Sequence, residues 1–161
     1  MQKTDFSAAA FRLLMKRGEK VSFAESLTGG LIAATFIANP GASSAIDESY
    51  VTYASASKVR ILGVSQETVE TVGVVSAKCA AEMAAGVRSI SGADWGVSAT
   101  GLAGPDGGTD ELPVGTVFIG ISGKNGTCAH ECHFCGSRME IRMQAADQAF
   151  RLLTQAIQNT D

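Results

Sequence analysis

The sequence is poor in residues that mark several common classes of protein. It has two histidines, three prolines and one tryptophan among 161 residues, and no apolar run approaches the roughly 18 residues of a membrane-spanning helix. Its first twenty residues, MQKTDFSAAAFRLLMKRGEK, lack the uninterrupted apolar core of a secretory signal. These absences favour a cytoplasmic protein that does not interact with membranes.

The basic residues are few and scattered. The 13 Lys and Arg are outnumbered by 16 Asp and Glu, giving a formal net charge of -3, so there is no electrostatic footprint for nucleic acid. With 45% hydrophobic and 18% charged residues the chain is globular. In a reducing compartment its four cysteines are expected to be free thiols.

What the sequence does contain is an alternation of helical and extended patterns along one domain, residues 1–161. Helices are expected at 6–17, at 28–38, through Lys58 to Leu62, after Ser65, at 77–91 and at 138–157, and strands at 21–26, 50–55, 95–101, 114–122 and 127–134. Gly18 and Ser76 provide a helix stop and a helix cap. Because the last two strands form a hairpin across the turn GKNG, we predict a three-layer α/β/α sandwich with a mixed sheet.

The stretch CAHECHFC, residues 128–135, suggests zinc at first sight. On a strand, however, Cys128, His130 and Cys132 face one side, and His133 and Cys135 face the other. A zinc site needs about four ligands that converge on one point, so we predict a sulfur-rich strand and no metal. Both histidines belong to this strand, which also weakens a Ser-His-Asp triad.

The stretch AESLTGG, residues 24–30, leads from a predicted strand into a helix. Amide groups at a helix N-terminus attract anions, so Ser26 or Thr28 could bind a phosphate or a carboxylate there, beside Gly29. Helix capping by either hydroxyl is the alternative.

The stretch GASSAIDESYVTYASASK, residues 41–58, combines serines with a tyrosine and a lysine. A serine hydroxyl needs a base to become a nucleophile, and a desolvated lysine can be that base. The candidate catalytic residues are therefore one serine of the pair Ser43 and Ser44, together with Tyr53 and Lys58. A loop of small residues with a surface lysine is the alternative.

The stretch TGLAGPDGG, residues 100–108, directly follows a buried strand. Ligands of open α/β sheets bind at the carboxyl ends of strands, and glycine amides can stabilise an oxyanion or a phosphate. Gly101 and Gly104 are the candidates in this loop, whose alternative role is a simple connection.

Taken together, these motifs resemble the C-terminal domain of CinA, the competence/damage-inducible protein, in a stand-alone form. The matching stretches occur in the family's order over residues 20–155: AESLTGG, NPGASSA, YVTYASASK, LGV, SATGLAGPDGG, PVGTVFIGI and FCGSR. Some positions depart from the family pattern, such as Leu27, where many members have cysteine.

The resemblance implies a nicotinamide-nucleotide amidase, which hydrolyses the carboxamide of nicotinamide mononucleotide to nicotinate mononucleotide and ammonia without a cofactor or metal. It implies Ser44 as nucleophile, Lys58 as its base and Tyr53 beside them. Substrate-binding residues by the same resemblance and by the loop arguments are Ser26, Thr28, Gly29, Gly101, Gly104, Arg138 and Arg142.

Three alternatives remain at this point. In the first, the nucleophile is Ser26 of the AESLTGG stretch, and loss of activity in a Ser26→Ala variant alone would indicate this. A nucleotide-binding module without catalysis, acting through protein partners, would share the anion site but would not need Lys58. A zinc protein built on residues 128–135 would contain stoichiometric metal. We also expect a homo-oligomer.

Overall fold

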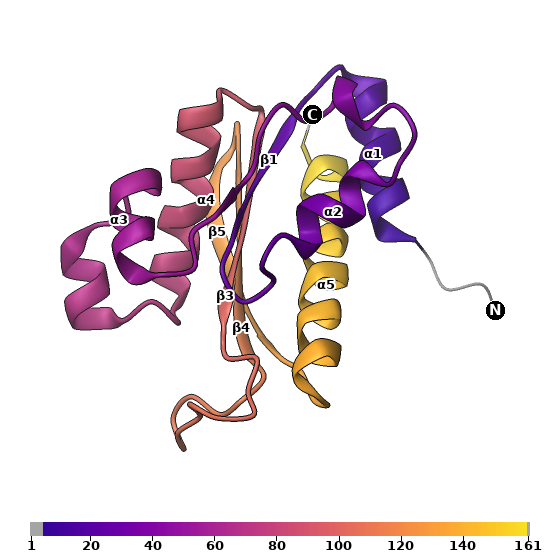
Figure 1. Cartoon of the computed structure of the whole chain (residues 1–161). Coiled ribbons are helices and arrows are strands. Elements are labelled where there is room, and N and C mark those ends of the chain that lie inside the picture. Colours follow the sequence, from indigo (N-terminus) through magenta and orange to yellow (C-terminus); the bar gives the residue numbers. More distant parts are fainter. Residues whose placement is uncertain (1–4, 161) are drawn as a thin grey trace.

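The computed structural model describes residues 5–160, which form one five-stranded sheet between two layers of helices (Figure 1). The strands are β1 Val21–Glu25, β2 Tyr50–Val51, β3 Trp95–Gly101, β4 Thr116–Gly123 and β5 Gly126–His133. The helices are α1 Phe6–Arg17, α2 Leu31–Ile37, α3 Ser55–Leu62, α4 Ala77–Ser91 and α5 Arg138–Gln158, with short turns of helix at Ala42–Ser44 and Thr68–Val72. The predicted α/β sandwich with a mixed sheet is confirmed.

The sheet runs in the order β2-β1-β3-β4-β5. The first three of these strands are parallel, and β4 and β5 continue antiparallel as the predicted hairpin. Helices α1, α2 and α5 cover one face, while α3 and α4 cover the other (Figure 1). The larger core packs the rings of Phe23, Phe36 and Phe150 against one another, and a smaller cluster around Met83 lies beneath α4.

Local sequence signals explain where the helices begin and end. Gly18 adopts φ 64° and closes α1, and the Ser76 side chain accepts a hydrogen bond from Cys79 N at the start of α4, as predicted. Helix α5 begins with a capping box in which Ser137 and Glu140 satisfy each other's backbone amides. This cap fixes the position of Arg138, the first residue of α5.

Strand β2 is shorter than the predicted 50–55. Only Tyr50 and Val51 pair with β1, and α3 begins already at Ser55. Thr52 N still donates to Glu25 O of β1, whereas the carbonyls of Thr52 and Tyr53 accept hydrogen bonds from the Lys58 side chain. The end of β2 therefore belongs to the candidate site rather than to the sheet.

The chain leaves β1 and β2 toward opposite faces of the sheet. After β1 it continues into α2 on the face with α1 and α5, and after β2 it continues into α3 on the other face (Figure 1). Such a divergence opens a crevice at the carboxyl ends of parallel strands, where ligands of doubly wound sheets bind. The loop at 26–30 and the loop at 52–54 flank this crevice.

The sulfur-rich stretch forms most of β5, an edge strand paired with β4 as predicted. Cys128 Sγ lies 3.5 Å from His130 Nε2, and all four cysteines are free thiols. Within residues 5–160, no three His, Cys, Asp or Glu side chains are placed to hold a metal ion together. Across the same residues, no helix is both long and apolar enough to cross a membrane.

Candidate active site

A buried lysine and a serine hydroxyl meet at the carboxyl end of β1. Lys58 Nζ lies 2.9 Å from Ser26 Oγ, within hydrogen-bond distance, and two backbone carbonyls lie beside it, Thr52 O at 2.7 Å and Tyr53 O at 3.1 Å. A neutral amine has two N–H donors and one lone pair. In the charged form Nζ donates to all three partners, Ser26 Oγ included; once neutral, it can donate to both carbonyls while its lone pair accepts the Ser26 proton.

Burial makes the charged form of Lys58 less favourable than it is in water. The side chain is 1% exposed, and none of its three hydrogen-bond partners carries a charge. Burial lowers the pKa of Lys58 below its ordinary value, and the nearby Cys79 raises it by a smaller amount. Cys79 offers little compensation because burial raises the pKa of its thiol to about 11. An amine placed in this way can act as a general base.

Ser26 is held by the end of the sheet. Its backbone N–H donates to Ala99 O of β3, which continues the β1–β3 pairing by one residue, and its carbonyl accepts from Gly29 N in a tight turn. The side chain is 9% exposed. The serine therefore has a fixed backbone and a hydroxyl close to the base.

A cavity of about 290 Å³ lies over this pair. It is lined by Ser26, Leu27, Tyr53, Lys58, Val74, Val75, Thr100, Gly101, Leu102, Ala103, Gly104, Asp106 and Arg138. Five predicted site residues besides Ser26 thus share one cavity: Tyr53, Lys58, Gly101, Gly104 and Arg138.

The two predicted glycines allow their loop to lie against neighbouring backbone and side chains. A Cβ on Gly101 would lie 2.6 Å from Thr116 O, and one on Gly104 would lie 2.4 Å from Val114 Cγ1. Gly104 also has φ 73°, which L side chains rarely adopt. Both glycines are required by the packing that forms this wall of the cavity.

Arg138 connects two walls at the mouth of the cavity. Its Nη1 donates to Gly104 O at 2.7 Å, and its Nη2 donates to the Tyr53 hydroxyl at 3.2 Å. The guanidinium remains exposed on its other edge. Of the two candidate phosphate-binding arginines, Arg138 is the one that lines the cavity.

Three other predicted binding residues do not line this cavity. Thr28 is completely buried, and its hydroxyl has no partner among residues 5–160. Arg142 instead donates from Nε to Leu27 O and from Nη2 to Thr28 O. Gly29 lies directly against this guanidinium, since a Cβ there would be 3.2 Å from Arg142 Nη2.

The anion expected at the start of α2 is already supplied by the protein. Glu25, completely buried, accepts hydrogen bonds from Ile32 N at 2.8 Å and from Ala33 N at 3.0 Å. A carboxylate in this position satisfies the free amides of the first helical turn and interacts well with the helix dipole. A ligand anion is therefore not needed there, and the prediction of one is corrected.

The structure also corrects the pairing of Ser44 with Lys58. Val21 N, at the start of β1, donates to Ala45 O, so the neighbouring Ser44 lies at the amino end of that strand. Ser26 follows the carboxyl end. Five residues of strand separate the two ends by about 16 Å at 3.3 Å per residue, beyond the reach of Lys58. The hollow beside Ser44 is lined by Ser43 and contains neither lysine nor histidine.

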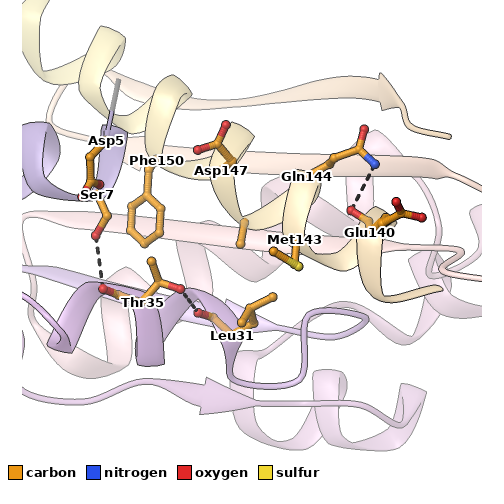
Figure 2. A pocket seen from close by; sticks show the side chains of 10 residues that line it. Asp5, Ser7, Leu31, Thr35, Glu140, Met143, Gln144, Asp147 and Phe150 are labelled. Atoms are coloured by element: carbon orange, nitrogen blue, oxygen red, sulfur yellow. Dashed lines mark hydrogen bonds between the residues drawn. The ribbon is translucent and has the colours of Figure 1, made fainter. Parts of the chain in front are cut away.

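A larger hollow of about 440 Å³ lies between α1, α2 and α5 (Figure 2). Its hydroxyls are engaged locally: Ser7 Oγ donates to Thr35 O, and Thr35 Oγ1 donates to Leu31 O. No lysine, arginine or histidine lines it. Its two hydroxyls already have backbone acceptors and no basic side chain is present to bind a phosphate, so the smaller cavity is the better candidate active site.

Sequence reasoning missed two residues of the candidate site. Thr100, the last but one residue of β3, is 1% exposed, and its hydroxyl donates to Val74 O at 2.7 Å. Asp106 lies in the glycine loop and adds an acidic group to the lining. A threonine within the buried run WGVSATG was a signal for the first, because buried polar side chains are usually hydrogen-bonded.

The fold and the site together define an α/β protein with a buried serine–lysine pair at the carboxyl edge of its sheet. The particular family follows from comparison with known proteins. The sequence pattern described as the CinA C-terminal domain matches residues 3–157, and the chain belongs to this family.

Relatives support this assignment. A CinA-like protein of Anaeromyxobacter is 46% identical over 144 residues, which are 89% of this chain and 35% of the relative. A CinA-like protein of Fervidobacterium nodosum is 44% identical over 91% of this chain and 36% of its own length. The chain thus spans about a third of the curated relatives that it matches.

Solved structures match over nearly the whole chain. The competence/damage inducible protein CihA of Agrobacterium tumefaciens has 37% identity and a TM-score of 0.90, with 99% of each chain covered. A CinA superfamily protein from Klebsiella pneumoniae has 31% identity and a TM-score of 0.93, covering 99% of this chain and 100% of its own.

Proposed function

We propose that this protein is an amidase that hydrolyses the carboxamide of nicotinamide mononucleotide to nicotinate mononucleotide and ammonia. The observation that supports it most is the 2.9 Å contact between Ser26 Oγ and a buried Lys58 with uncharged partners. The family resemblance supplies the substrate, and the geometry supports Ser26 in place of Ser44 as the nucleophile.

In the proposed reaction, Lys58 Nζ takes the Ser26 proton as Oγ attacks the carboxamide carbon. The tetrahedral intermediate carries a negative oxygen, and it collapses when the C–N bond breaks and the Lys58 ammonium protonates the leaving nitrogen. Ammonia leaves and an acyl-serine ester remains. Lys58 then removes a proton from water, which attacks the ester carbon; as the C–Oγ bond breaks, Lys58 returns that proton to Ser26 Oγ, and the acid leaves as its carboxylate after losing its proton to solvent.

Arg138 is the proposed phosphate-binding residue. It lines the same cavity as Ser26. A guanidinium can bind a phosphate through two parallel hydrogen bonds. One of its present contacts, Gly104 O or the Tyr53 hydroxyl, would then be exchanged for a phosphate oxygen. This gives Tyr53 a role at the mouth of the cavity rather than in proton transfer.

The test is an ammonia-release assay with nicotinamide mononucleotide on the purified protein, with and without a chelator. We expect turnover that survives the chelator and is absent in Ser26→Ala. A protein that releases no ammonia contradicts the proposal. Turnover that the chelator abolishes favours a metal-dependent reaction instead.

The second candidate function is a nucleotide-binding module without catalysis. The exposed Arg138 beside the glycine loop favours it, because this anion site does not depend on Lys58. Titration calorimetry with nicotinamide mononucleotide separates the two functions. Binding without ammonia release supports the module, and binding with ammonia release supports the amidase.

A further inference from the structure

Two backbone N–H groups follow Ser26 directly in the turn, those of Leu27 and Thr28. Neither Leu27 N nor Thr28 N donates to an acceptor within residues 5–160, although Leu27 is 4% exposed and Thr28 is completely buried. A buried amide without a partner costs about 1–3 kcal/mol. Such groups are uncommon in folded proteins and need an explanation.

The carbonyls of the same peptide groups are firmly held. Ser26 O accepts from Gly29 N at 3.1 Å, and Leu27 O accepts from Arg142 Nε at 2.8 Å. In a trans peptide the N–H points away from the carbonyl of the same plane. Fixing the carbonyls of Ser26 and Leu27 therefore also fixes the directions of the Leu27 and Thr28 amides.

Arg142 contacts the backbone of this turn but does not line the cavity in which the proposed reaction takes place. Its second contact, from Nη2 to Thr28 O at 3.0 Å, clamps the next peptide group as well. Gly29 leaves just enough space, because its missing Cβ would stand 3.2 Å from Nη2. Arg142 does not line the cavity of Ser26 and Lys58, whereas Leu27 does.

Arg142 Nη2 holds Thr28 O and so orients the Gly29 N–H of the same peptide group, which donates to Ser26 O and thereby sets the direction of the Leu27 amide. On the basis of the proposed amidase function, we propose that Arg142 is a positioning residue that in this way aligns the Leu27 amide, which belongs to a residue lining the cavity, as a donor for the oxyanion of the tetrahedral intermediate. The Leu27 N–H directly follows the proposed nucleophile in the chain, and a fixed N–H donor beside the reacting carbonyl stabilises the negative oxygen that forms there. Fixed donors act on charge as it develops, so Arg142 should affect the chemical step and not substrate binding.

The test compares Arg142→Lys with Arg151→Lys, an exposed arginine on the same helix that packs over the Phe6 ring. Lysine keeps the charge but loses the two-pronged contact with Leu27 O and Thr28 O. We expect kcat for nicotinamide mononucleotide to fall about 100-fold, the magnitude of a lost oxyanion donor, with KM within about threefold of the parent. The control should keep both constants within about twofold.

A second readout does not depend on turnover. Pyridine-3-boronic acid can form a tetrahedral, negatively charged adduct with a serine hydroxyl, which resembles the proposed intermediate. We expect Arg142→Lys to weaken its binding, measured by calorimetry, by about the same factor as kcat. The pH dependence of kcat/KM should stay unchanged, because Arg142 does not contact Lys58.

Several outcomes overturn the inference. It is wrong if Arg142→Lys keeps kcat and boronate binding within threefold of the parent, or if KM rises while kcat is unchanged, which would make Arg142 a substrate ligand. If the parent releases no ammonia, the proposed function fails, and boronate binding still decides the role of Arg142. Arg142→Gln, which retains one N–H donor group, serves if the lysine variant unfolds below the assay temperature.

Discussion

The two ends of β1 each carry a serine motif with small residues around it, and they differ in what lies nearby. At the carboxyl end, Ser26 is 9% exposed and lies within 2.9 Å of a buried amine. At the amino end, Ser44 is exposed in a short helical turn beside a hollow without lysine or histidine. The serine hydroxyl has a buried amine beside it at one end, and at the other it lies by a hollow lined by neither lysine nor histidine.

This difference shows that a nucleophile is defined by its partner. A serine hydroxyl ionises too weakly to attack an amide by itself, so the base decides which serine reacts. The base belongs to the carboxyl end because the chain turns from β2 into α3 there and directs Lys58 back over β1. At the amino end, Ser44 lies in a short helical turn, and the hollow beside it is lined in part by α2.

The assignment of Ser26 rather than Ser44 as the nucleophile is tested most strongly by removing each hydroxyl in turn. We expect Ser26→Ala to lower kcat for nicotinamide mononucleotide by about 10³-fold or more, because no nucleophile remains. Ser44→Ala should stay within about twofold, as an exposed residue away from the site. Ammonia release by the two variants, with thermal unfolding to confirm that both fold, checks this. Near-normal turnover in Ser26→Ala, or loss in Ser44→Ala, reverses the assignment.

The next prediction concerns the base. Because burial lowers the pKa of Lys58, kcat/KM should rise with pH through an ionisation below the ordinary lysine value, as the amine loses its proton. Lys58→Met should lower kcat by about 10²- to 10⁴-fold and remove this pH dependence. The measurement is a pH–rate profile of both proteins. A variant that retains the ionisation would show that another group is the base.

A smaller effect is expected at the mouth of the cavity. Arg138→Met should raise KM for nicotinamide mononucleotide about 10- to 100-fold, the value of a lost charged hydrogen bond, with a lesser change in kcat. Nicotinamide riboside, which lacks the phosphate, should react equally well with parent and variant. If the variant loses the same factor with both substrates, Arg138 does not bind the phosphate.

The smallest expected effect is on stability. The folded-state pKa of Lys58 lies below its unfolded value, so the unfolded chain binds more protons between the two values, and parent stability should rise with pH across that window. Lys58→Met removes a buried amine and should be more stable than the parent below the window, by about 1–4 kcal/mol. Urea unfolding at several pH values measures both. A less stable variant would show that the lysine contacts hold the fold.

Much of this architecture could be predicted from local patterns. Helix 6–17, the cap at Ser76, the hairpin of β4 and β5, and the start of the last helix at Arg138 all follow from periodicity and capping residues within a few positions. Each of these signals depends on residues that are close together in the chain, so a single sequence is sufficient to predict the elements that they define.

The site was only partly predictable, because it depends on which loops meet at one edge of the sheet. Spacing places Ser44 nearer to Lys58 along the chain than Ser26, yet the contact at 2.9 Å spans 32 positions and goes to Ser26. Likewise, no local pattern shows that Glu25 would occupy the amides of α2, or that Arg142 would bind Leu27 O.

The most direct test of the central claim is to identify the serine that Lys58 activates. A fluorophosphonate, which reacts with activated serine hydroxyls, is incubated with the parent protein and with Lys58→Met, and the modified residue is located by peptide mass spectrometry. The account predicts a single phosphonate on Ser26 of the parent, faster at higher pH, and little labelling of Lys58→Met. Labelling of Ser44, or equal labelling of Ser26 with and without Lys58, would contradict it.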